Sequence, residues 1–150
     1  MRFFFCSLAI IGLVMNCTPG SGNKAYEKLD HTTQIIFDKY MIQGKELYQQ
    51  HCTNCHQSFG EGVRRLVPSL VQNISIDQPA VMACLIKTGT STSRRAPRDN
   101  NPLKMPGNQK LTYLEIAELI TYISNSWGNE YGLIQPTSVE KWLNNCSGLD

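Results

Sequence analysis

The sequence lacks a membrane-spanning segment, an excess of either charge and any alternating strand pattern. Its longest nearly unbroken apolar run covers residues 3–15, which is 13 residues, whereas a spanning helix needs about 20. The formal net charge of the 150 residues is +2, too close to zero to indicate nucleic-acid binding. No segment alternates apolar and polar residues as a half-buried strand would. These absences predict a single all-α domain.

The N-terminus has the features of an export signal. Arg2 precedes the apolar run of residues 3–15, so residues 1–16 are expected to be a signal peptide excluded from the fold. The segment Leu13-Val14-Met15-Asn16-Cys17 resembles a bacterial lipoprotein signal, in which the cysteine becomes the acylated first residue. We therefore expect an exported protein on the periplasmic side, lipid-anchored to a membrane through Cys17. The alternative is ordinary cleavage nearby and a soluble secreted protein.

Cys52-Thr53-Asn54-Cys55-His56 has the spacing of a c-type haem attachment site. Two thiols on one turn of chain can each add to a vinyl group of one porphyrin. The neighbouring imidazole of His56 then serves as an axial ligand of the iron. The sequence thus predicts one covalently bound haem c, with Cys52 and Cys55 as its thioether anchors.

Two other uses of a CxxC motif fit the sequence less well. A zinc site needs a second Cys or His pair, but the downstream cysteines are single and far apart, and no histidine follows His56. A thioredoxin-like motif follows a buried strand, whereas residues 40–51 are polar and helix-like. Haem attachment is therefore favoured over both.

The remaining cysteines suggest a disulfide. Once Cys6 leaves with the signal, Cys17 takes lipid and the motif takes haem, Cys84 and Cys146 form an even pair. Disulfides persist in an oxidising compartment, so we expect these two residues to be bridged. The alternative is two buried free thiols.

The rest of the chain is expected to form a tether followed by helices. Residues 17–37 are polar and turn-rich, and the 20 residues from 18 to 37 could span at most roughly 65 Å as a flexible tether. The domain is expected to occupy residues 38–150, with a C-terminal extension at 129–150. Thr112 and Glu115 form a capping box, onto which Leu111 adds a hydrophobic staple with Ile116, and Thr137 is the expected cap of the last helix. Helices are expected at residues 39–51, 78–88, 112–125 and 139–145.

An irregular stretch at residues 90–110 contains the second candidate ligand of the iron. Met105 lies in a loop stiffened by Pro102 and Pro106, which can hold a thioether at the iron. Met82, the other downstream methionine, falls inside an expected helix and is assigned to the core. The same stretch contains four basic residues that form either a solvated loop or a rim for an acidic partner: Arg94, Arg95, Arg98 and Lys104.

Taken together, these features resemble class I cytochrome c over residues 39–128. In that family a glycine and an aromatic residue precede the first haem cysteine by eight and four positions, as Gly44 and Tyr48 do here. The resemblance implies a helix crossing of Gly44 against the helix that carries Leu119 and Tyr122. It also implies that the Pro68 carbonyl accepts a hydrogen bond from the second nitrogen of His56. The implied fold has three main helices around the haem and a short C-terminal helix.

The resemblance implies a one-electron carrier and not an enzyme. His56 would be the proximal ligand and Met105 the distal one. The implied partners are a quinol-oxidising complex, a terminal oxidase or a dehydrogenase, which the protein would meet as a monomer or as a membrane-complex subunit. Two alternatives remain. One is a haem subunit or domain of a larger dehydrogenase or oxidase. The other is a haem enzyme or gas sensor with an open iron site.

Overall fold

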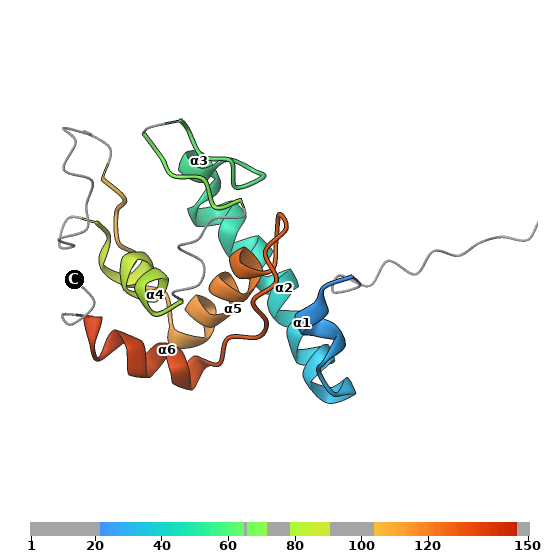
Figure 1. The fold of residues 1–150 in the computed structure, drawn as a ribbon. Helices are drawn as coiled ribbons and strands as arrows, with labels where there is room; N and C mark the ends of the chain where they lie inside the picture. The colour runs from blue at the N-terminus through green and yellow to red at the C-terminus, as the bar shows by residue number, and fades with distance from the viewer. Residues whose placement is uncertain (1–21, 65, 72–78, 91–103, 147–150) are drawn as a thin grey trace, which may run out of the picture.

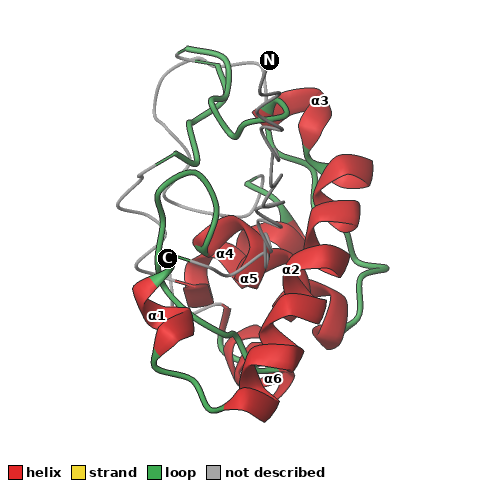
Figure 2. Ribbon diagram, turned by 90° about the vertical axis from the view of Figure 1, so that its right-hand side faces the viewer, coloured by secondary structure: helices red, strands yellow, loops and turns green. Residues whose placement is uncertain are grey.

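The computed structural model describes residues 22–64, 66–71, 79–90 and 104–146, and these residues form helices joined by loops (Figures 1 and 2). Within these ranges the chain forms no strand, only two isolated bridges, Val63 with Val67 and Gly89 with Pro106. The predicted all-α class is therefore confirmed. In chain order the helices are α1 Lys24–Glu27, α2 His31–His51, α3 Thr53–His56, α4 Pro79–Thr88, α5 Tyr113–Ser124 and α6 Pro136–Leu143.

The core is organised around the crossing of α2 and α5, which lie against each other in Figure 1. Gly44 of α2 is buried at this crossing. A Cβ atom there would overlap the carbonyl oxygen of Glu118 and would lie 2.7 Å from the Cβ of Tyr122. The backbones of the two helices can approach this closely only because Gly44 has no side chain. The predicted crossing is confirmed.

Helix α5 begins with the predicted capping box. The Thr112 hydroxyl accepts a hydrogen bond from the Glu115 amide at 3.2 Å, and the Glu115 carboxylate accepts one from the Thr112 amide at 2.7 Å. Leu111 and Ile116, the expected staple, are both buried. These contacts satisfy backbone donors that the first turn of a helix leaves unpaired. They fix the start of the most buried helix.

Helix α2 begins at His31, well before the predicted residue 39, and α1 precedes it. The Asp30 carboxylate caps α2 by accepting from the amides of Thr32 and Thr33. Phe37 is fully buried, and its ring lies 5.3 Å from that of Tyr26. The prediction of a flexible tether that reaches residue 37 is therefore wrong, because apolar burial orders its second half.

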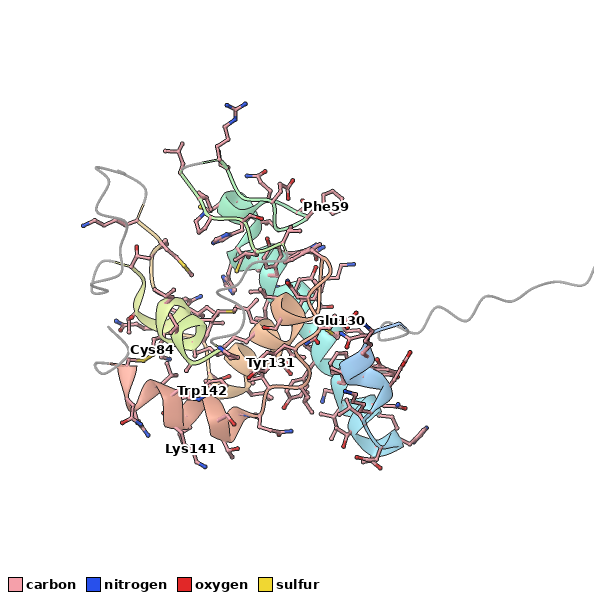
Figure 3. The ribbon with its side chains drawn as sticks, viewed as in Figure 1. Phe59, Cys84, Glu130, Tyr131, Lys141 and Trp142 are labelled. Atoms are coloured by element: carbon pink, nitrogen blue, oxygen red, sulfur yellow. A yellow bond between two sulfur atoms is a disulfide. The ribbon has the colours of Figure 1, made fainter. Side chains whose placement is uncertain are left out.

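Helix α6 closes the other end of the chain against α4 and α5. It begins with Pro136 after Gln135, so the predicted start at Val139 and the predicted cap by Thr137 are wrong. Proline suits the first helical position because it lacks an amide hydrogen that the helix could not use there. Cys84 of α4 and Cys146 form the predicted disulfide, with their Cα atoms 5.6 Å apart; Figure 3 labels Cys84 and Trp142 where the two helices meet.

Several predictions fall on residues outside the described ranges. These are the signal peptide, the acylation site Cys17 and the basic residues Arg94, Arg95 and Arg98. Among the described helices, none combines the length and the apolar character needed to cross a membrane.

Candidate functional site

Helix α3 carries the CxxCH motif directly after α2. Cys52 ends α2 and starts α3, and its carbonyl accepts a hydrogen bond from the His56 amide at 2.8 Å. Cys52 and Cys55 are both free thiols, and residues three apart on a helix are neighbours on its surface. Burial, with a smaller effect of Cys55, raises the pKa of the Cys52 thiol to about 12. Both cysteines are thus unbridged and lie on one helical turn.

The imidazole of His56 is oriented by a backbone carbonyl. Its Nδ1 lies 3.1 Å from the carbonyl oxygen of Pro68, which is the contact expected from the resemblance. A carbonyl oxygen can only accept, so Nδ1 carries the hydrogen and Nε2 keeps its lone pair. Burial lowers the pKa of His56, which the hydrogen bond to Pro68 partly offsets. The ring is therefore neutral at pH 7 with Nε2 ready to bind a metal ion.

The loop formed by residues 57–64 and 66–71, called the 57–71 loop below, holds Pro68 in place. The Tyr48 hydroxyl donates to the Gln57 carbonyl at 2.6 Å, where the loop starts, and the Leu70 amide donates to the Gly60 carbonyl at 2.7 Å, near its end. Gly62 has φ +66°, and a Cβ atom on it would lie 2.7 Å from the Pro68 oxygen. The loop thus folds back on itself and brings the Pro68 carbonyl to His56.

Met105 lies on a segment fixed to the C-terminal end of α4. Its amide donates to the Thr90 hydroxyl at 2.9 Å, and its carbonyl accepts from the Thr90 amide at 3.0 Å. The side chain of Met105 is partly buried and packs against the hydrophobic core. Met82 of α4 also packs against this core, as predicted. The backbone of Met105 is therefore held by two hydrogen bonds, which suits a ligand that must keep one position.

The residues present fit a haem. Two unbridged thiols precede an imidazole with a free Nε2, and a thioether is held on a separate segment. Thioether and imidazole are a known axial pair of haem iron. Apolar side chains next to the motif, on α4 and on the Met105 segment pack against the core without being fully buried, which suits the edge of an apolar ring: Leu47, Leu70, Met82 and Met105. In the part of the chain that the structure describes, no three His, Cys, Asp or Glu side chains group as a metal site.

One aromatic contact near the motif was not predicted. The Trp127 ring, just after α5, lies 5.1 Å from the ring of Tyr48 and 5.5 Å from that of Tyr122. The family resemblance points to the two tyrosines but not to Trp127, their partner. The available signal was the position of a large aromatic residue between the end of a predicted helix and Gly128.

Comparison with known proteins gives one family and two relatives. A model of the cytochrome c family matches residues 41–127. The chain is 29% identical over 117 residues to "Alcohol dehydrogenase (quinone), cytochrome c subunit" of Gluconacetobacter polyoxogenes, and equally to the protein of that name from Komagataeibacter europaeus. Each match covers 75% of this chain but only 24% of the relative. The chain thus spans about a quarter of the length of these curated relatives.

Proposed function

Because the chain belongs to the cytochrome c family, we propose that it holds one covalent haem c between His56 and Met105 and transfers one electron at a time. The bound haem supplies an iron that changes between its ferric and ferrous states. The observation that carries the proposal is the bond from His56 Nδ1 to the Pro68 carbonyl, 3.1 Å long. It leaves Nε2 as the ligand atom, beside two unbridged thiols.

The side chains divide the work of holding and tuning the redox centre. Cys52 and Cys55 are the covalent anchors, and His56 is the proximal ligand. Met105 would be the second residue to hold the iron, and its soft thioether would favour ferrous iron and raise the reduction potential relative to a second imidazole. If His56 and Met105 both hold the iron of the bound haem, small molecules would have little access to it. This favours an electron carrier over an open-site haem enzyme or gas sensor.

We propose that this domain works with a dehydrogenase. The two relatives are named as cytochrome c subunits of a quinone alcohol dehydrogenase, and both match this chain only over a quarter of their length. This supports a haem-bearing subunit or close partner of a membrane dehydrogenase over a free shuttle to a quinol-oxidising complex or terminal oxidase. A tagged chain that copurifies with a dehydrogenase would support the first role, and one that copurifies with an oxidase would support the second.

We also propose export and lipid anchoring at Cys17, for which the support is the N-terminal sequence pattern. Intact mass spectrometry of the protein from a membrane fraction should give added acyl mass on Cys17. A mature protein without this mass, recovered in the soluble fraction, would contradict the anchor but leave the electron-transfer function unaffected.

A pair of methionine variants tests the haem site. A pyridine haemochrome assay should give one haem per chain. In Met105→Leu we expect loss of the weak red absorption band that accompanies a bond between ferric iron and methionine sulfur, together with new carbon monoxide binding.

Met82→Leu is the matched control, because Met82 is the other downstream methionine and packs against the same core. It should keep the band. Loss of the band in Met82→Leu but not in Met105→Leu would exchange the two roles, and carbon monoxide binding by the unchanged protein would favour the open-site alternative.

A further inference from the structure

We propose that Trp127 and Asn129, directly after α5, are positioning residues for the proximal imidazole, because they hold the 57–71 loop that carries Pro68. The inference rests on the proposed haem function and adds two residues to it. Asn129 lies beyond the family match, which ends at residue 127. Neither residue touches His56 in the contacts described above, so both would act through the loop.

Trp127 covers the first half of the loop. A Cβ atom on Gly60 would lie 2.6 Å from Cε3 of the Trp127 ring, so the ring rests directly on the glycine backbone. The Trp127 ring also lies against Tyr48 and Tyr122, at centroid distances of 5.1 and 5.5 Å. Tyr48 is itself buried and donates its hydroxyl to the Gln57 carbonyl. The ring therefore connects the loop to both helices of the central crossing.

Asn129 holds the second half of the loop. Its side-chain amide donates to the Leu70 carbonyl at 3.0 Å and to the Ile123 carbonyl at 3.2 Å. The first bond joins residues 59 positions apart in sequence, and the second fixes the amide to the last turn of α5. Asn129 thus connects the end of the loop to the end of a helix in the core.

The contact of Trp127 with Gly60 and the hydrogen bond of Asn129 to Leu70 lie on either side of Pro68 in the sequence. Gly60 and Leu70 are also bonded to each other, since the Leu70 amide donates to the Gly60 carbonyl at 2.7 Å. Val67, one residue before Pro68, exchanges two backbone hydrogen bonds with Val63. The Pro68 carbonyl is therefore positioned by a closed loop whose two ends are held by residues after α5.

The position of this carbonyl has an electronic consequence. A hydrogen bond from Nδ1–H to a carbonyl makes the imidazole a more basic ligand and fixes its orientation. A loosened loop would weaken this bond, so Nε2 would donate less charge to the metal and ferric iron would be less stabilised. Loss of either attachment should therefore raise the reduction potential of the bound haem.

The test uses Asn129→Ala and Trp127→Phe in the haem-loaded protein. Both should shift the reduction potential upward in protein-film voltammetry. In ferrous protein the His56 Nδ1 hydrogen, followed by NMR, should exchange with solvent about fivefold faster in Asn129→Ala, the factor that one ordinary hydrogen bond contributes. Asn144→Ala, a change of the same type at an exposed position after α6, is the control and should change neither value.

The outcomes separate a positioning role from a structural one. An unchanged potential and exchange rate, with only a lower melting temperature, would make the two residues ordinary stabilising contacts and overturn the inference. The haem function would then stand. A wild-type protein that binds no haem in a host able to attach it would overturn both. If Trp127→Phe does not fold, Asn129→Ala alone decides the question.

Discussion

At the scale of single residues, Gly44 is a position where the fold has no room for a side chain. It lies where α2 crosses α5, and its missing side chain is what lets the carbonyl of Glu118 approach. Glycine inside a helix costs about 1 kcal/mol relative to alanine. The chain retains this cost because a wider crossing would separate the rings of Tyr48 and Tyr122, whose centroids lie 5.5 Å apart.

We expect Gly44→Ala to lower the free energy of unfolding by about 1–3 kcal/mol, the usual cost of overpacking, in spite of its better helix propensity. Urea denaturation of the haem-loaded protein measures the change. Lys45→Ala, exposed on the next residue, is the control and should stay within about 0.5 kcal/mol of the wild type. A Gly44→Ala protein more stable than the wild type would show that the crossing has free space.

Single residues also show how far the sequence predicts the candidate site. The CxxCH spacing is local, so Cys52, Cys55 and His56 could be identified from five consecutive residues. The bond from His56 to Pro68 could be expected only from a family resemblance, because it spans 12 residues. The bond from Asn129 to Leu70 has no local signal at all, since it depends on where the chain goes after α5.

At the scale of elements, α5 is the helix whose start depends most clearly on side chains. Its first turn is closed by Thr112 and Glu115, which satisfy each other's backbone amides. The hydrogen bond from the Thr112 amide, and then that from its hydroxyl, lowers the pKa of Glu115. A carboxylate whose pKa is lowered by folding stabilises the fold when the pH is above its ordinary pKa of 4.5. This stabilisation is lost as the pH falls through the lowered pKa.

We therefore expect Thr112→Ala to cost about 1 kcal/mol at pH 7. Glu115→Ala should also destabilise the protein at pH 7, but its difference from the wild type in free energy of unfolding should narrow at pH 3, where a larger fraction of the carboxylate is protonated. Denaturation curves at the two pH values measure this. Thr112→Ser keeps the cap and should behave like the wild type. If the difference in free energy of unfolding between Glu115→Ala and the wild type is the same at both pH values, the charge of Glu115 contributes nothing to stability.

The helix boundaries that were wrong also had signals in the sequence. The start of α2 was placed too late because residues 31–38 show no clean apolar period, although Asp30 is a good N-cap residue. The predicted start of α6 is too late because Thr137 resembles a helix cap, although Pro136 is a strong marker of a first helical position. In α2 the added part includes the buried Phe37, whereas α6 begins where a proline suits the first helical position.

At the scale of the whole molecule, the segments outside the family match are part of the folded body. Phe37, Ile134 and Val139 are at most 3% exposed, and all lie outside residues 41–127. Asn23 donates to the Asn125 side chain at 3.0 Å across 102 residues of sequence. Contacts over such separations cannot be predicted from local patterns. The Cys84–Cys146 pair could be predicted, because cysteine counting needs no geometry.

Removal of this disulfide should affect one end of the molecule most. The bridge closes a segment of 62 residues and joins α4 to the end of α6. We expect Cys84→Ala/Cys146→Ala to lose up to about 4 kcal/mol, as loop entropy predicts. Hydrogen exchange should increase first in α6. A reductant that breaks the disulfide should destabilise the wild-type protein but should have no further effect on the double variant. Equal loss of protection in all helices would show that α6 is not a separate unit.

The hydrogen bond from Asn23 to Asn125 would also set the reach of a protein anchored at Cys17. If Cys17 is acylated, only the five residues 18–22 separate the bilayer surface from the folded body. Fully extended, that connection covers about 20 Å, less than the width of a small domain. With so short a connection, a haem protein could rotate at the membrane but could not move between distant complexes. Its electron donor and acceptor must come to it, or be built beside it.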